Sequence, residues 1–106
     1  MFLMNSEDDK YGIHAIDEVI HGKVRLAAMA FISGAGEADF TAIKKAIKAS
    51  DGNLSVHLRK LEDAGYLVVT KQFSDRRPQT IYALSEDGIR AWQAYLQQMT
   101  ALLAES

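Results

Sequence analysis

Apolar residues recur every three or four positions along most of the chain, which is the spacing of an amphipathic α-helix. A first run of this kind starts at Ile13 and is interrupted by Gly22. A second run follows and ends at residues 33–36, a Ser-Gly-Ala-Gly segment typical of a helix C-terminus. The pattern therefore predicts two helices in the first third of the chain, after a polar, acidic tail over residues 1–12.

Two further helices are predicted in the middle of the chain. Asp39 is a good N-cap for the first of them, over residues 40–48. The second is expected over residues 53–64, where three leucines starting at Leu54 fall at i, i+4 and i+7 and must share one buried face. Since only about four residues separate the two helices, they have the arrangement of a helix-turn-helix.

The period changes after the second of these helices, where two strands are expected. Residues 66–73 and 79–84 are rich in β-branched and aromatic side chains. The segment between them, residues 74–78, contains two arginines and the only proline of the chain. This pattern predicts a β-hairpin with a basic turn.

A last helix is predicted from its N-cap Ser85 to about Leu103. Its apolar residues lie at alternating steps of three and four, as in a heptad seam, over an arc too wide for a small domain to bury alone. We therefore expect a homodimer interface formed by this helix and the first helix, although a helix that covers only its own core stays open as an alternative. The residues assigned to the interface are Ile13, Ile16, Ile20, Ile89, Trp92, Tyr95, Leu96, Met99 and Leu103.

The charges are unevenly distributed along the sequence. The whole chain has a formal net charge of −2, which taken alone counts against a nucleic-acid partner. Between residues 41 and 80, however, there are eight Lys and Arg residues and four Asp and Glu residues, which gives a local charge of +4. This basic block would attract a polyanion locally, and a solvated lysine-rich surface explains the charge equally well on its own.

The order of the elements, taken together with the positions of the cations, indicates binding to double-stranded DNA. The second helix of a helix-turn-helix enters the major groove, and arginine and asparagine side chains suit the recognition of base edges. A basic hairpin turn beside it would contact phosphate or the minor groove. The residues assigned to DNA are Lys44, Asn53, Ser55, Val56, His57, Arg59, Lys60, Lys71, Arg76, Arg77 and Thr80.

Some of these polar residues have structural alternatives that stay open. His57 also suits a hydrogen bond in the layer between helices, and Asn53 suits a contact with backbone amides at the start of its helix. For Thr80, stabilisation of the hairpin is the favoured interpretation over a DNA contact. Arg25, at the start of an earlier helix, suits either a phosphate contact or an intramolecular ion pair.

Two stretches have a distinctive sequence. Residues 51–66 read Asp-Gly-Asn-Leu-Ser-Val-His-Leu-Arg-Lys-Leu-Glu-Asp-Ala-Gly-Tyr, and residues 76–80 read Arg-Arg-Pro-Gln-Thr. On these motifs the chain resembles the compact winged-helix regulators related to the MarR and ArsR groups, over about residues 16–96. The resemblance implies a mainly α-helical winged helix-turn-helix with a small β-hairpin, a recognition helix over residues 53–64 and a wing over residues 71–80. It also implies a DNA-binding transcriptional regulator. The length of the chain predicts a single domain, residues 13–106.

Enzyme activity is not expected. The chain has no cysteine, and we find no phosphate-cradling glycine loop and no paired nucleophile and base in the sequence. His14, Asp17 and His21 share a helical face and suit half of a metal site, but scattered surface polar residues explain them better, so no metal or cofactor is expected.

Further expectations concern location and partners. The apolar stretches are too short for a signal peptide or a membrane span, so we expect a cytoplasmic protein with no membrane partner. One alternative is a winged helix that binds other proteins without specific DNA binding. A small-molecule effector that binds at the dimer seam near Trp92 and Tyr95 also stays open.

Overall fold

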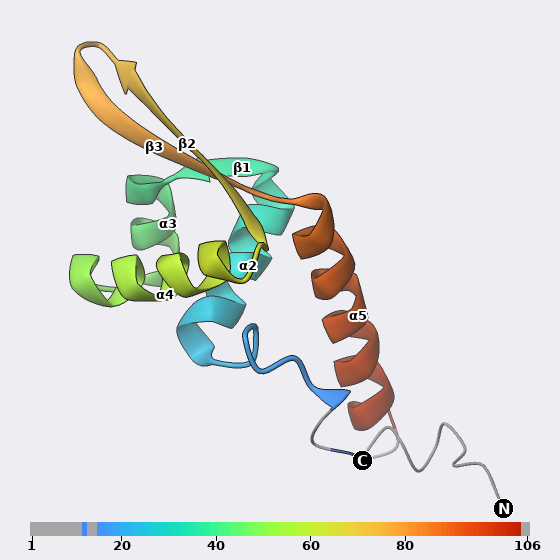
Figure 1. Ribbon diagram of the computed structural model, residues 1–106. Helices are drawn as coiled ribbons and strands as arrows, with labels where there is room; N and C mark the ends of the chain where they lie inside the picture. Colours follow the sequence, from blue (N-terminus) through green and yellow to red (C-terminus); the bar gives the residue numbers. More distant parts are fainter. Residues whose placement is uncertain (1–11, 13–14, 105–106) are drawn as a thin grey trace, which may run out of the picture.

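The computed structural model describes residue 12 and residues 15–104. Its elements follow the order α2 (Lys23–Ala35), β1 (Glu37–Asp39), α3 (Phe40–Ile47), α4 (Asp51–Asp63), β2 (Leu67–Ser74), β3 (Arg77–Leu84) and α5 (Glu86–Leu103). The strands form an antiparallel sheet in the order β1-β3-β2. Figure 1 shows the β2–β3 hairpin extending away from the helices and α5 standing on the opposite side of α2 from α3 and α4.

The core lies where α2, α3 and α4 meet. All three leucines of the predicted buried face of α4 are fully enclosed, together with side chains from the other two helices. The largest fully buried side chains are Ile20, Met29, Ile32, Ile43, Leu54, Leu58 and Leu61. The prediction from the leucine spacing is therefore confirmed, and the opposite face of α4 is left to solvent.

Within the described residues 15–22 the predicted first helix is not present, because the chain there has a 3₁₀ residue at position 15 followed by bends and a turn. The carboxylate of Asp17 accepts hydrogen bonds from the backbone N–H groups of Val19, at 2.8 Å, and Ile20, at 3.1 Å. An aspartate that bonds its own backbone two and three residues on stabilises a turn and competes with helix formation. Ile13, which was expected to start this helix, lies outside the described residues.

The short strand β1 was not predicted. It pairs with β3 in the register Ala38 opposite Tyr82, and Ala38 is buried. Asp39 ends the strand and caps α3, where its side chain accepts a hydrogen bond from the backbone N–H of Ala42 at 2.8 Å. This hydrogen bond is the main cause of the lowered pKa of Asp39. A hydrogen bond from Gln79 lowers the pKa further, and burial partly offsets both effects. The predicted N-cap is confirmed.

The hairpin turn is shorter than predicted. Asp75 and Arg76 alone connect β2 to β3, and both lie in the left-handed region, with φ of 53° and 67°. Positive φ at both central residues is typical of a type I′ turn, whose twist suits a β-hairpin. Pro78, expected in the turn, lies in β3 opposite Phe73. Because β1 pairs only with residues 81–83, no strand covers that side of β3 at Pro78, and proline is tolerated at such an edge.

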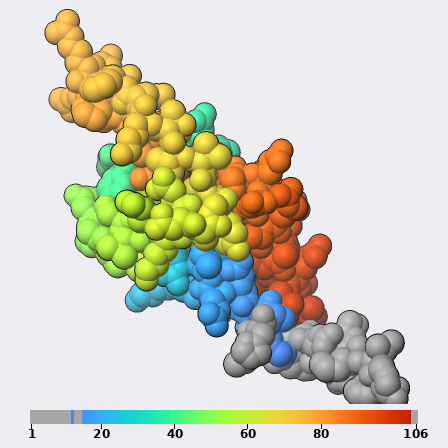
Figure 2. Space-filling view, in the orientation of Figure 1, coloured from blue at the N-terminus to red at the C-terminus, as the bar shows by residue number. Residues whose placement is uncertain are grey.

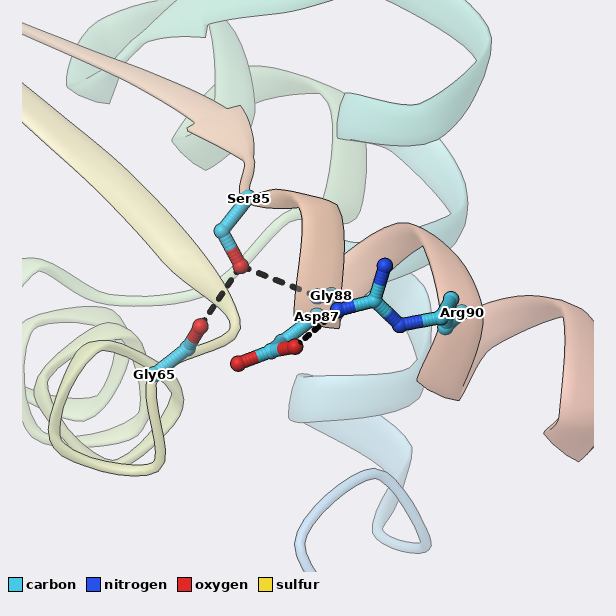
Figure 3. A network of polar contacts seen from close by, with 5 residues as sticks. All are labelled: Gly65, Ser85, Asp87, Gly88 and Arg90. Carbon is cyan, nitrogen blue, oxygen red and sulfur yellow. Dashed lines mark hydrogen bonds and ion pairs between the residues drawn. The ribbon is translucent and has the colours of Figure 1, made fainter.

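The start of α5 is fixed to the junction between α4 and β2 (Figure 3). The Ser85 hydroxyl accepts from the backbone N–H of Gly88 at 2.9 Å, as predicted for the N-cap, and donates to the Gly65 carbonyl at 2.5 Å. The Ser85 N–H donates to the Tyr66 carbonyl at 3.0 Å. A Cβ at Gly88 would lie 2.1 Å from that same carbonyl oxygen. Only glycine therefore allows α5 to approach so closely.

Two tyrosines connect the turn at residues 17–21 to the rest of the fold. The Tyr66 hydroxyl donates to Asp17 at 2.6 Å, and the Tyr95 hydroxyl lies 2.8 Å from Nδ1 of His21. The bond to Asp17, with burial, raises the pKa of Tyr66 to about 12. Asp17 and His21 are thus used in structural contacts, and the described residues contain no cluster that could hold a metal ion.

Candidate nucleic-acid interface

Helix α4 presents a polar face to solvent. Ser50 caps its start by accepting from the backbone N–H of Asn53 at 3.2 Å, so the capping role left open for Asn53 belongs to Ser50. The exposed residues on this face include Asn53, Ser55, Val56, Arg59 and Lys60, all of which were assigned to DNA. Their exposure follows from the burial of the leucines on the opposite face.

Two cations of the predicted interface form ion pairs with nearby aspartates. Arg59 lies 3.2 Å from Asp63, one turn further along α4, and both side chains are well exposed. Such an exposed i, i+4 pair contributes only about 0.3–0.5 kcal/mol, so Arg59 can exchange this carboxylate for a DNA acceptor. Lys44 of α3 lies 2.8 Å from Asp51 at the start of α4 and ties the two helices together.

The hairpin brings further cations to the same side of the protein as α4. A hollow of about 560 Å³ lies between them, lined by Ser55 and Arg59 from α4 and by Lys71 and Thr80 from the hairpin. Thr80 is half-buried opposite Lys71 in the register of the hairpin. Arg76 and Arg77 are exposed at the tip, and Figure 2 shows the hairpin extending well past the body of the protein.

His57 is placed differently from its neighbours on α4. It is half-buried, and its Nδ1 lies 2.8 Å from Nη1 of Arg25. Burial, followed by the charges of Arg25 and Lys60, lowers the pKa of His57. Arg25 also donates to the backbone carbonyls of Val19 at 2.5 Å and Glu18 at 3.4 Å. The contact between helices that was left open for His57 is therefore present.

The winged helix DNA-binding domain family matches the sequence over residues 24–103. The chain belongs to this family. An uncharacterized protein of Methanocaldococcus jannaschii is 28% identical over 85 residues, which make up 80% of this chain and 92% of that protein. A structure described as that of a transcriptional regulator homologue from Pyrococcus horikoshii is similar at 26% identity with a TM-score of 0.79, covering 95% of this chain and 97% of the other. A MarR-family regulator from Silicibacter pomeroyi, at 18% identity, matches in fold, with a TM-score of 0.63 over 82% of this chain and 57% of its own.

Family membership confirms the predicted winged helix. Helices α3 and α4 form its helix-turn-helix, with α4 as the second helix, and the β2–β3 hairpin is its wing. The winged-helix protein is accordingly a DNA-binding regulator and not an enzyme. Among the described helices, none is both long and apolar enough to span a membrane.

Helix α5 of the winged-helix protein has an exposed apolar stripe. Ile89, Leu96 and Leu103, spaced seven residues apart, are 45%, 45% and 66% exposed. Trp92 and Met99 lie beside the stripe and are half-buried. The spacing of the stripe agrees with the predicted heptad seam, and these three side chains are left exposed by the described residues.

Two residues assigned to the dimer interface are instead part of the core of the winged-helix protein. Ile20 is 0% exposed and Tyr95 is 4% exposed. The Tyr95 ring also stacks on Trp92, with centroids 6.0 Å apart and planes at 11°. Both side chains are covered by their own chain and do not belong to a partner-facing surface. Ile16 is half-buried.

A hollow lies near the region proposed for an effector. A hollow of about 320 Å³ lies between α5 and the segment at residues 15–17, with Ile16, Ala91 and Tyr95 in its lining. Trp92 is not among the lining residues. The suggested effector site near Trp92 and Tyr95 therefore stays a prediction.

Proposed function

We propose that this winged-helix protein is a sequence-specific transcriptional regulator that binds operator DNA as a homodimer in the cytoplasm. Helix α4 enters the major groove, and the wing lies along the backbone or in the minor groove. The observation that carries this proposal is the shared hollow between α4 and the wing, where Ser55, Arg59 and Lys71 converge. A duplex that follows this surface meets both elements at once.

The two elements have different roles in the proposal. Asn53, Ser55 and Arg59 are exposed on one rigid helix, and their donors and acceptors suit base edges in the major groove. The wing cations are Arg76, in the turn, and Arg77, at the start of β3. They attract any phosphate within reach, which positions the protein without reading the base sequence.

The dimer rests on the apolar stripe of α5. Three large side chains at intervals of seven residues match the seam of a helix pair, and association would remove them from water. A two-fold axis between the protomers would place two α4 helices about 34 Å apart, one turn of DNA, so the operator is a pseudo-palindrome.

The first experiment is a gel shift against the DNA upstream of the protein's own gene, at several salt concentrations. If the dimer neutralises six to ten phosphates, affinity falls by about 10³–10⁵ between about 50 and 200 mM salt. An affinity that stays flat across this range would refute the DNA proposal and favour a winged helix that binds another protein.

The second experiment separates base recognition from phosphate contact. Arg59→Ala removes a candidate base contact and is expected to lose about 1–3 kcal/mol on the operator and much less on random DNA. The double variant Arg76→Ala with Arg77→Ala is expected to weaken both affinities about equally. Arg90→Ala, which removes an exposed arginine of α5, serves as the matched control. The reverse pattern would exchange the roles assigned to α4 and the wing.

A further inference from the structure

The contact between Arg25 and His57 determines which ring nitrogen of the histidine carries a proton. Nη1 of Arg25 lies 2.8 Å from Nδ1 of His57. A guanidinium has five N–H donors and no acceptor, and it stays charged in proteins. Nδ1 must therefore accept the hydrogen bond, so it carries no proton. The ring is neutral, with its one N–H on Nε2.

The Nε2–H group of His57 is not buried. In the described part of the chain, no side-chain nitrogen or oxygen is both buried and without a hydrogen-bond partner. Among the residues that the structure describes, the one hydrogen bond of the His57 side chain is that at Nδ1, so Nε2 is not buried. Asn53 precedes His57 by four residues and Lys60 follows it by three, which places all three on neighbouring positions of α4. The free donor thus lies beside two exposed residues assigned to DNA.

Arg25 is held in place from several sides. Its guanidinium donates to the carbonyls of Val19 and Glu18, in the turn that precedes α2. A Cβ at Gly22 would lie 3.2 Å from Nη2 of Arg25, so the glycine leaves room for the guanidinium. A side chain with this many contacts presents a fixed donor to His57.

We propose that Arg25 is a positioning residue for DNA binding: it holds His57 in the neutral form with the proton on Nε2, so that this N–H donates to a phosphate oxygen beside the major groove. The inference rests on the proposed DNA binding through α4. Arg25 itself stays bonded to the protein and makes no phosphate contact. A phosphate is the acceptor because His57 is half-buried at the border between α4 and the start of α2, set back from the fully exposed residues of α4.

The charges around His57 favour the same neutral form. Arg25 faces it from α2 and Lys60 from its own helix, and both oppose a second positive charge on the ring, in addition to burial. Asp17, in the neighbouring turn, is already bonded to Tyr66 and to backbone N–H groups. Protonation of His57 at acidic pH would remove the acceptor at Nδ1 and place two cations in contact.

The first test uses NMR of the free protein and does not depend on DNA. Long-range ¹H–¹⁵N correlation is expected to show His57 with an unprotonated Nδ1 and a protonated Nε2. Arg25→Ala is expected to give a mixture of the two tautomers, and Arg25→Lys, which keeps one charged donor, to restore the Nε2 form in part. A proton on Nδ1 of the unaltered protein would overturn the proposal, whatever the protein does with DNA.

The second test is a double-variant cycle on DNA affinity. His57→Ala and Arg25→Ala are each expected to reduce affinity about 3- to 10-fold per protomer, as for one lost hydrogen bond in each copy, and the double variant to lose no more than either. The salt dependence is expected to stay unchanged in Arg25→Ala, because Arg25 neutralises no phosphate in this proposal and its loss does not change the number of counterions displaced. A salt slope reduced by about 0.9 per protomer, with additive losses, would mean that Arg25 contacts phosphate directly and would refute the positioning role.

Controls separate the remaining outcomes. Arg90→Ala removes an arginine from α5 and is expected to leave tautomer, affinity and salt slope unchanged. A loss for His57→Ala on the operator but not on random DNA would identify a base edge as the acceptor and overturn the phosphate assignment. If the unaltered protein binds no DNA, the proposed function fails, while the tautomer measurement still reports on Arg25 and His57 alone.

Discussion

The wing turn contains an arginine where glycine is conformationally favoured. Arg76 has a φ of 67° at the second central position of the two-residue turn. A left-handed conformation costs a residue with a Cβ about 1–2 kcal/mol, and glycine adopts it freely. Glycine also increases the conformational entropy of the unfolded chain, which lowers the free energy of unfolding by about 0.4–1 kcal/mol. Arg76→Gly is therefore expected to raise the free energy of unfolding by about 0.5–1 kcal/mol.

The same substitution is expected to weaken DNA binding. Arg76 is an exposed cation at the tip of the wing, and its removal takes one phosphate contact from each protomer. Each neutralised phosphate contributes about 0.9 to the slope of log affinity against log salt, so a dimer loses about 1.8. Stability and DNA affinity are thus expected to change in opposite directions.

The assay combines thermal unfolding with fluorescence anisotropy on operator DNA at several salt concentrations. The expected stability gain corresponds to a rise in Tm of about 2–8 °C. Arg76→Ala is the control, because it removes the same charge and keeps the Cβ, so it weakens DNA binding without the gain in stability. If Arg76→Gly is no more stable than Arg76→Ala, the argument from backbone strain is wrong. An unchanged salt slope would show that Arg76 does not contact DNA.

Three other substitutions test the dimer and the junctions of the fold. Leu96→Glu places a charge on the exposed stripe of α5 and is expected to give a folded monomer by sedimentation; a persistent dimer would locate the interface elsewhere. Gly88→Ala places a Cβ against the Tyr66 carbonyl and is expected to destabilise the fold by about 1–3 kcal/mol in urea unfolding. Gly34→Ala is the control, because Gly34 has open space around it, and it is expected to stabilise the fold by about 0.5–1 kcal/mol. The hydrogen bond from Tyr66 to Asp17 stabilises the folded state fully below pH 10, the ordinary pKa of tyrosine, and this contribution is lost as the pH rises through about 12. Tyr66→Phe is expected to remove that alkaline loss, and an unchanged pH profile of unfolding would contradict the assignment.

The helices with strong amphipathic patterns were predictable, because their signals are local. The spacing of the leucines located α4, and the N-caps Asp39 and Ser85 located the starts of α3 and α5. The segment before α2 has the same apolar spacing, but the side chain of Asp17 bonds to the backbone of a turn and prevents a helix. Strand β1 has only three residues and exists because it pairs with β3, more than forty positions later, so no local pattern could reveal it.

The candidate site was predictable in its composition more than in its contacts. The exposure of the cations on α4 follows from the leucine face, which the sequence displays. The contact of Arg25 with His57 joins residues 32 positions apart and depends on how α2 packs against α4. Helical spacing also shows which residues of α5 share a face without showing which face meets the core. Tyr95 is enclosed while its neighbour Leu96 is exposed for this reason.

The position of Pro78 affects how the hairpins of neighbouring molecules can pair with each other. The hairpin projects from the body, and the stretch of β3 beyond the end of β1 is an open sheet edge. The unpaired backbone groups of an open edge can form hydrogen bonds with a strand of another molecule, and such pairing leads to aggregation. Pro78 lies in that stretch and offers no N–H to an incoming strand. The stretch of β3 around Pro78 is therefore a poor template for a strand from another molecule, and the outer edge of β2 is the side of the hairpin that stays open to pairing.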